Sequence, residues 1–130
     1  METNDRSNVA AADFEQWVVE ALDGLPDFVK EHLNNVEVVV ADWPSPQELR
    51  AVGLNHRWQL LGLYQGVPLT RRTSGYNLVP PDKITLFRCP IERICPTPEA
   101  VRQQVRKTVI HELAHHFGIS DARLKALGAY

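Results

Sequence analysis

The sequence is poor in the residues and patterns that mark several classes of protein. It has only two cysteines among 130 residues, and they do not form a C-x-x-C pair. With no second pair, the ligand set of a structural zinc ribbon is missing. Since disulfides are rare in a reducing cytosol, we expect Cys89 and Cys95 to be free thiols that serve as packing residues.

Long apolar runs and an excess of one charge are also missing. The longest strongly apolar run, VEVVVA from Val36, is far too short to span a bilayer. The net charge is -2 and the pI about 6.2, so nothing favours a general attraction to nucleic acid or anionic lipid. The first ten residues lack the apolar core of a secretion signal. These absences predict a cytoplasmic monomer without a membrane or nucleic-acid partner, and a flexible tail over residues 1–10.

The remaining composition and the local patterns predict one globular domain. Hydrophobic residues make up 44% of the chain and charged residues 23%, which is the balance of a globular protein. Apolar residues at helical spacing indicate helices, and β-branched or continuous apolar runs indicate strands. The predicted helices cover 11–26, 26–35, 45–53, 97–118 and 120–128, and the predicted strands cover 36–42, 58–68 and 83–91. With a long polar loop over 68–82, this order predicts a single α+β domain over residues 11–130.

The longest predicted helix carries two rows of side chains. Thr97 is suited to cap it, Pro98 to begin it and Gly118 to end it. Residues four apart lie on one face of a helix, which predicts a buried row that Ile110 and Ala114 widen. That row consists of Val101, Val105, Val109, Leu113 and Phe117. A second row, rotated from the first, consists of Gln104, Thr108, His111 and His115.

The second row ends in two histidines that are one helical turn apart. At this spacing His111 and His115 can hold the same metal ion, and imidazole suits zinc. Glu112 lies one position further round, where it can take a proton from water activated by the ion. This is the H-E-x-x-H pattern of zinc peptidases. A catalytic zinc needs a third protein ligand, and Asp121, three residues after the expected turn at Gly118, offers a carboxylate.

Simpler interpretations of the same residues stay open at this point. The two histidines could be solvated on a helix face, and Asp121 could serve the final helix by meeting the N–H groups at its start. His116 points about 100° away from His115 on the helix, which favours a surface or supporting role over metal binding. His32 and His56 are expected on the surface.

Three segments, LLGLYQGVPL, DKITLFRCPI and VRKTVIHELAHHFGISDARL, together resemble the small bacterial zincin-like proteins, a family of predicted minimal zinc metallopeptidases. The resemblance extends over residues 11–128. It implies a reduced zincin-like fold, in which a small mixed sheet packs on an active-site helix, and a cytoplasmic peptidase with a peptide or protein substrate. It also implies one catalytic Zn²⁺ held by His111, His115 and Asp121, with Glu112 as the catalytic general base.

Two features depart from related proteins. The chain has Cys89 where the family has a glycine, and it lacks the methionine turn of the wider metzincin group, because its only methionine is Met1. By the same resemblance, KITLFR over 83–88 is expected to be the strand along which a peptide pairs. Tyr76 and Tyr130 are candidates for a second oxyanion donor, although a packing or exposed position is favoured for each.

Two other functions compete with a peptidase. The bacterial rRNA-maturation metallo-endoribonucleases space three ligands as H-x3-H-x5-H, which this chain matches with Asp121 in place of the last histidine. Glu112 at the general-base position and the lack of a basic stripe for phosphates oppose that function. A non-catalytic metal-binding or interaction module with the zincin fold is the other alternative, since a fold and its ligands do not establish turnover. Iron or manganese also suits two histidines and a carboxylate.

Overall fold

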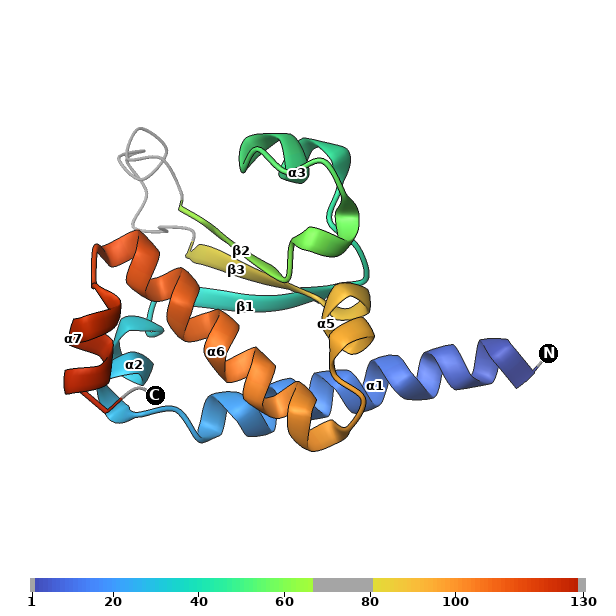
Figure 1. The fold of residues 1–130 in the computed structure, drawn as a ribbon. Coiled ribbons are helices and arrows are strands. Elements are labelled where there is room, and N and C mark those ends of the chain that lie inside the picture. Colours follow the sequence, from blue (N-terminus) through green and yellow to red (C-terminus); the bar gives the residue numbers. More distant parts are fainter. Residues whose placement is uncertain (1, 67–80, 129–130) are drawn as a thin grey trace, which may run out of the picture.

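The computed structural model describes residues 2–66 and 81–128, with the side chains of residues 12–66 and 81–128. Figure 1 shows helices packed around one small sheet, and the predicted α+β class is confirmed. The elements are α1 (Glu2–Asp23), α2 (Asp27–His32), β1 (Val36–Ala41), α3 (Pro46–Ala51), the 3-10 helix η1 (Arg57–Gln59), β2 (Gly62–Gln65), β3 (Asp82–Phe87), α5 (Arg88–Ile94), α6 (Pro98–Phe117) and α7 (Asp121–Ala126). Within the described ranges, no helix is long and apolar enough to cross a membrane.

The three strands form one mixed sheet in the order β1-β3-β2. β1 runs parallel to β3, with Val36 opposite Asp82. β2 runs antiparallel to β3 along its other side, with Gly62 opposite Leu86. β3 is therefore the central strand of the described sheet, and its last four residues are all buried. The small mixed sheet that the family resemblance implies is confirmed.

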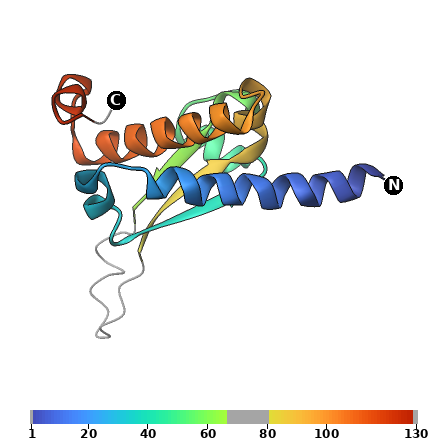
Figure 2. The same ribbon diagram turned by 90° about the horizontal axis from the view of Figure 1, so that it is seen from below.

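One face of the sheet is covered by α1 and α6, which lie side by side in Figure 2. Ile84 and Leu86 of β3 belong to the core on this side, whereas Phe87 belongs to a second core on the other side. This division follows from the alternation of side chains along a strand. The helices contribute most of the first core, including Phe14, Val18, Ala21, Leu25, Val29, Val101, Val105, Val109, Leu113 and Leu124.

α1 begins earlier than the sequence predicts. The expected helix starts at residue 11 after a flexible tail, but the structure continues α1 back to Glu2, so the predicted tail over residues 1–10 is helical from residue 2. Alanines at positions 10–12 favour this extension, because lengthening an existing helix adds one hydrogen bond for each residue that is ordered. Figures 1 and 2 both show the first part of α1 projecting beyond α6.

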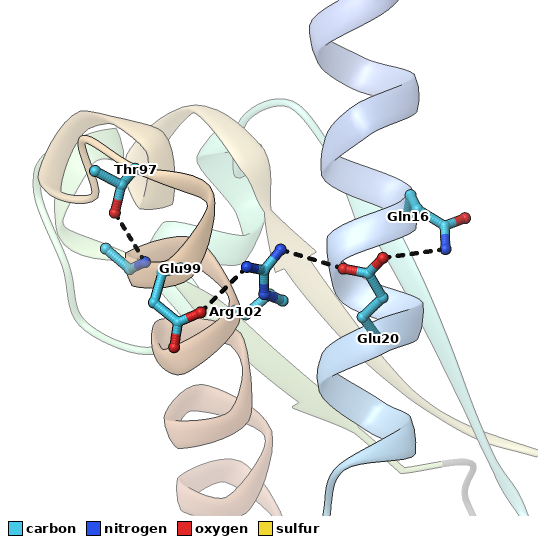
Figure 3. A network of polar contacts seen from close by, with 6 residues as sticks. Gln16, Glu20, Thr97, Glu99 and Arg102 are labelled. Atoms are coloured by element: carbon cyan, nitrogen blue, oxygen red, sulfur yellow. Dashed lines mark hydrogen bonds and ion pairs between the residues drawn. The ribbon is translucent and has the colours of Figure 1, made fainter.

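Polar contacts join the exposed flank of α1 to the start of α6 (Figure 3). Arg102 donates from Nη1 to Glu20 at 3.2 Å and from Nη2 to Glu99 at 3.1 Å. Gln16 donates to the same Glu20 carboxylate at 3.5 Å. Thr97 Oγ1 accepts an N–H of the first turn of α6 at 3.1 Å. Because exposed ion pairs stabilise little, this network orients the two helices, and the apolar core holds them together.

The chain passes from strand to helix at Arg88, which is earlier than predicted. The sequence predicts a strand over 83–91, but α5 already begins at Arg88. Pro90 lies in the first turn of α5, where its missing N–H loses no helical hydrogen bond. Arg88 fixes this corner by donating from Nε to Asp42 at 2.9 Å and from Nη1 to Glu92 at 2.6 Å. Burial opposes the charge on Arg88, but the two hydrogen bonds outweigh it and raise the pKa of the guanidinium.

Residues 42–61, here called the α3 arm, connect β1 to β2 on the side of the sheet away from α1 and α6 (Figure 1). Ser45 caps α3: Ser45 Oγ accepts the Glu48 N–H at 3.1 Å, and Glu48 Oε1 accepts the Ser45 N–H at 2.8 Å. At the other end, the Leu54 N–H donates to the Leu49 carbonyl at 2.9 Å across Gly53, whose φ is +73°. This is a Schellman turn, which glycine adopts readily.

Two further sets of contacts attach the α3 arm to the sheet. Leu49 and Leu54 pack against the second core of Leu60, Leu63 and Phe87. At the root of the arm, a stack of aromatic rings and guanidinium groups connects four residues. The Trp43 and Trp58 rings meet edge-on at 4.5 Å, Arg57 lies 3.8 Å over Trp43, and Arg93 of α5 lies 4.4 Å over Trp58. The arm is thus fixed at its root and at both ends of its helix.

Both cysteines are free, as predicted. Cys95 is buried in the main core, and this burial raises the pKa of its thiol. Partial burial also raises the pKa of Cys89; Arg88 opposes this shift, and Asp42 and Glu92 add to it. Both thiols therefore stay protonated at neutral pH, which suits packing residues.

Candidate metal and catalytic site

α6 has the ends that the sequence predicts. Thr97 is its N-cap, Pro98 its first residue and Gly118 its C-cap. Gly118 adopts the left-handed conformation with φ +71°, which glycine reaches at little steric cost. The Ile119 N–H then donates to the Ala114 carbonyl at 2.8 Å. The chain therefore turns sharply after α6 and returns toward its last turns.

The two rows predicted for α6 separate, with one exception in each row. Val101, Val105, Val109 and Leu113 are buried, and Ile110 and Ala114 widen the buried face. Thr108 of the second row is buried as well. Phe117 is predicted in the first row, but it is 47% exposed in the last turn, where its ring contacts the rings of His32, Tyr64 and His116. The predicted core row therefore ends at Leu113.

His111, Glu112 and His115 lie on the other face of α6. The two histidines are exposed and Glu112 is half-buried, as expected for residues off the core row. All three line one hollow of about 360 Å³ together with Tyr64 of β2. Their side chains are therefore available to solutes, and the simpler interpretation of the two histidines as solvated residues on a helix face stays open.

Asp121 begins α7, and Ser120 is the residue that caps this helix. Ser120 Oγ accepts the Arg123 N–H at 3.2 Å, so the capping role considered for Asp121 belongs to its neighbour. Asp121 instead lines a second, smaller hollow with His111 and His115. The turn at Gly118 thus brings the carboxylate back beside the histidine pair.

The three predicted ligands surround one hollow but do not converge. In the part of the chain that the structure describes, no three His, Cys, Asp or Glu side chains gather closely enough to hold a metal ion. The type of donor nevertheless fits zinc, which binds histidine nitrogens and carboxylate oxygens. His111, His115 and Asp121 are all exposed, so rotation of their side chains does not disturb the core. The ligand set stays a prediction.

A strand other than the predicted one borders this site. KITLFR was expected to be the strand that pairs with a peptide, but it forms β3, whose two edges are occupied by β1 and β2. β2 is the edge strand of the described sheet on the side of α6. The Phe87 N–H donates to the Leu61 carbonyl at 2.9 Å, so the backbone groups of Leu61 face β3. By alternation, those of Gly62 and Tyr64 face the outer edge.

Glu112 contacts this outer edge directly. Its Oε1 accepts the Tyr64 N–H at 3.0 Å, which agrees with the direction that the register gives to that group. The carboxylate of the H-E-x-x-H motif is therefore held against the strand that an extended peptide would meet. The contact joins residues 48 positions apart, and helix periodicity alone could not reveal it.

Gly62 allows β2 and α6 to approach each other. A Cβ added at Gly62 would lie 2.6 Å from Thr108 Cγ2 and 3.3 Å from the Thr85 carbonyl oxygen. Thr108 is buried and lies one turn before Glu112 on α6. The missing side chain therefore sets the distance between the edge strand and the face of α6 that carries Glu112. An isolated glycine within an apolar strand is a sequence signal for such close approach, and it could have singled out Gly62.

His116 supports the strand side of the site. Its ring stacks on Tyr64 with centroids 3.9 Å apart, and its Nε2 lies 3.9 Å from Asp82 Oδ2. Tyr64 donates its hydroxyl to the same oxygen of Asp82 at 2.6 Å. These contacts agree with a supporting role for His116 beside the motif.

In the part of the chain that the structure describes, the remaining histidines do not line the site, and the two candidate tyrosines are not in that part. His32 and His56 are exposed as expected, and His56 Nδ1 accepts the Trp58 N–H at 3.2 Å at the start of η1. Tyr76 and Tyr130, the candidates for an oxyanion donor, lie outside the described residues. Of the loop predicted over 68–82, residues 68–80 also lie outside them, and Asp82 begins β3.

Comparison with known proteins supports a particular family. A family model described as zincin-like metallopeptidase matches residues 33–129. No curated protein matches the chain. The matched range contains the whole sheet, α6 and α7, but neither α1 nor α2.

Proposed function

The chain belongs to the zincin-like metallopeptidase family, and on this premise we propose that it is a zinc-dependent peptidase with Glu112 as its general base. One observation carries the proposal: the Glu112 carboxylate, next to His111 and His115 in one hollow, bonds to the outward N–H of edge strand β2. A proton acceptor, two metal donors and a surface for an extended chain thus meet at one place.

The edge of β2 would bind the substrate. An extended peptide adds to a sheet edge through backbone hydrogen bonds, and the backbone groups of Gly62 and Tyr64 face this edge. The close approach at Gly62 keeps such a peptide near α6. The scissile bond would then lie beside Glu112, because Glu112 contacts Tyr64 at 3.0 Å.

His111, His115 and Asp121 would hold the ion. Bound zinc supplies a Lewis acid that polarises a carbonyl and acidifies water. Glu112 takes the proton of the attacking water at a carboxylate oxygen and delivers it to the nitrogen of the leaving amine. For this step the carboxylate leaves the Tyr64 N–H or shares it, and a half-buried side chain at the cleft wall has room to do so.

Metal content is the first experimental test. Protein purified without chelator would be compared by mass spectrometry with His115→Ala and Asp121→Ala, and His56→Ala and Asp13→Ala serve as exposed controls away from the site. We expect near-stoichiometric zinc in the wild type and in both controls, and loss in the two site variants. Zinc retained in Asp121→Ala would remove Asp121 from the ligand set. Absence of zinc from the wild type, even after zinc is added, would refute the proposal.

Hydrolysis of a fluorogenic peptide library is the second test. Glu112→Gln should lower turnover by about 10²- to 10⁴-fold while zinc is retained. Glu99→Gln makes the same change on the same helix, in the exposed network of Figure 3, and should leave turnover unchanged. Zinc binding without hydrolysis that depends on Glu112 would favour a non-catalytic metal-binding module.

A further inference from the structure

The cleft beside Glu112 consists of two adjoining hollows, which share Leu60, Gly62, His111 and Glu112. The hollow toward the start of α6 is lined by Gln59, Gln104 and Lys107 together with apolar side chains. The other hollow has an apolar wall, which consists of Val52 and Leu54 of the α3 arm and Leu63 of β2.

Contacts within the α3 arm hold the apolar wall in place. The Schellman turn at Gly53 directs Leu54 inward against Leu49 and leaves Val52 at the rim. Val52 is 41% exposed, although burial of such a side chain is favourable. The Trp43 and Trp58 stack holds the root of the arm. The wall therefore exists before a ligand arrives, and little ordering is needed on binding.

The charged residues beside the apolar wall limit the kind of side chain that this hollow accepts. Its described lining contains no lysine or arginine, and its only carboxylate is Glu112. A basic side chain would compete for the carboxylate needed in catalysis, and an acidic one would compete for the proposed zinc ion. A bulky aliphatic or aromatic side chain would cover Val52 and Leu54 and remove their surface from water.

Resting on the proposed function, we propose that the cleft selects peptides with a bulky apolar side chain next to the cleaved bond, seated against Val52, Leu54 and Leu63. The α3 arm is then the specificity element of the enzyme.

The test combines cleavage with binding. Cleavage sites of the zinc-loaded protein in a peptide library would be read by mass spectrometry for wild type, Val52→Asp and Val52→Ala. Binding of the probe peptides acetyl-AALAA-amide and acetyl-AADAA-amide would be measured by NMR on Glu112→Gln protein, with and without Val52→Asp. Val19→Asp makes the same change at an exposed valine of α1 and is the matched control. Circular dichroism would check that each variant folds.

We expect wild type and Val19→Asp to prefer leucine or phenylalanine over aspartate by about 10-fold or more. Val52→Asp should abolish this preference, and Val52→Ala should weaken it. Cleavage without an apolar preference, or a preference that Val52→Asp leaves intact, overturns the inference while the peptidase function stands. No cleavage, with binding of the leucine probe that depends on Val52, refutes the peptidase function and retains the apolar site. If the protein neither cleaves peptides nor binds the leucine probe selectively, both the peptidase function and the apolar site are overturned.

Discussion

At the scale of single residues, Gly62 is the position among the described glycines where an added side chain would make the closest contact. Gly62→Ala would place a methyl group 2.6 Å from Thr108 Cγ2, a separation that forces β2 and α6 apart. Overpacking of this kind costs about 1–3 kcal/mol, and the displacement would also lengthen the Glu112 contact with Tyr64. We expect a lower free energy of unfolding in urea and a loss of peptidase activity.

A double-mutant cycle tests whether the contact with Thr108 causes the loss of stability in Gly62→Ala. Thr108→Ser removes the opposing methyl group and keeps the hydroxyl that accepts from Gln104 Nε2 at 3.0 Å. Gly62→Ala should cost less in this background than in the wild type. As a control, Gly24→Ala meets nothing nearer than 3.7 Å and should leave stability unchanged or slightly raised. An equal cost of Gly62→Ala in both backgrounds would show that this contact is not its origin.

Cys95 makes stability depend on pH in the alkaline range. Because burial raises its pKa, the folded protein keeps a proton that the unfolded chain loses as the pH passes the ordinary pKa of a thiol. The folded state then binds more protons, so the free energy of unfolding falls as the pH rises through that window. The stability difference between wild type and Cys95→Ala should be constant near pH 6–7 and should shift against the wild type by about pH 10. Urea unfolding at these pH values measures it, and a difference that is the same throughout would contradict the shift.

The residues of the motif could be predicted from the sequence, and their partners across the fold could not. Helical spacing places His111, Glu112 and His115 on one face without any structure. It says nothing of Tyr64, because that contact depends on which strand pairs with which. The prediction that Phe117 is buried was wrong for a related reason. Spacing gives the face of a helix, but it does not show how far along the helix the covering elements extend.

At the scale of elements, the position of the α3 arm depends on the stack of rings and guanidinium groups at its root. Arg57→Ala and Arg93→Ala each remove one cation from a tryptophan face, which costs about 0.5–1 kcal/mol at an exposed site. We expect faster hydrogen exchange in residues 42–61 and unchanged exchange in the core of α6, measured by mass spectrometry. Arg106→Ala, at an exposed arginine of α6, is the control. Unchanged exchange in the arm of both variants would show that the stack does not hold it.

Element order explains why the predicted peptide-binding strand was wrong. KITLFR was chosen from the family resemblance, and a strand pattern in the sequence indicates a buried central strand as readily as an edge. β2 is short and contains Gly62, which weakens its strand signal. The sheet order that makes β2 the edge is a tertiary fact, set by the parallel pairing of β1 with β3.

At the scale of the whole molecule, the N-terminal helix divides into two parts. Among the side chains that the structure describes, burial in α1 begins at Phe14, and the part before it projects beyond α6 (Figure 2). Removal of residues 1–10 should therefore change the free energy of unfolding by only about 0.5 kcal/mol. Removal of residues 1–25 also deletes Phe14, Val18, Ala21 and Leu25 from the core.

The second truncation should not fold. Loss of one buried phenylalanine side chain costs about 3–5 kcal/mol, against a total stability of about 5–15 kcal/mol. Near-UV circular dichroism and urea unfolding of both truncated chains would test this. A cooperative transition in the shorter chain would show that the range matched by the family model, residues 33–129, is sufficient without α1.

The bond between Glu112 and Tyr64 has a consequence for how copies of the molecule behave toward one another. An open sheet edge offers its backbone donors to any other strand, and this is a common route to aggregation. Here a carboxylate occupies one such donor at 3.0 Å and adds negative charge to that edge. The residue that we propose as the catalytic base would thus also disfavour edge-to-edge pairing between copies of the molecule, as long as no substrate peptide displaces this contact.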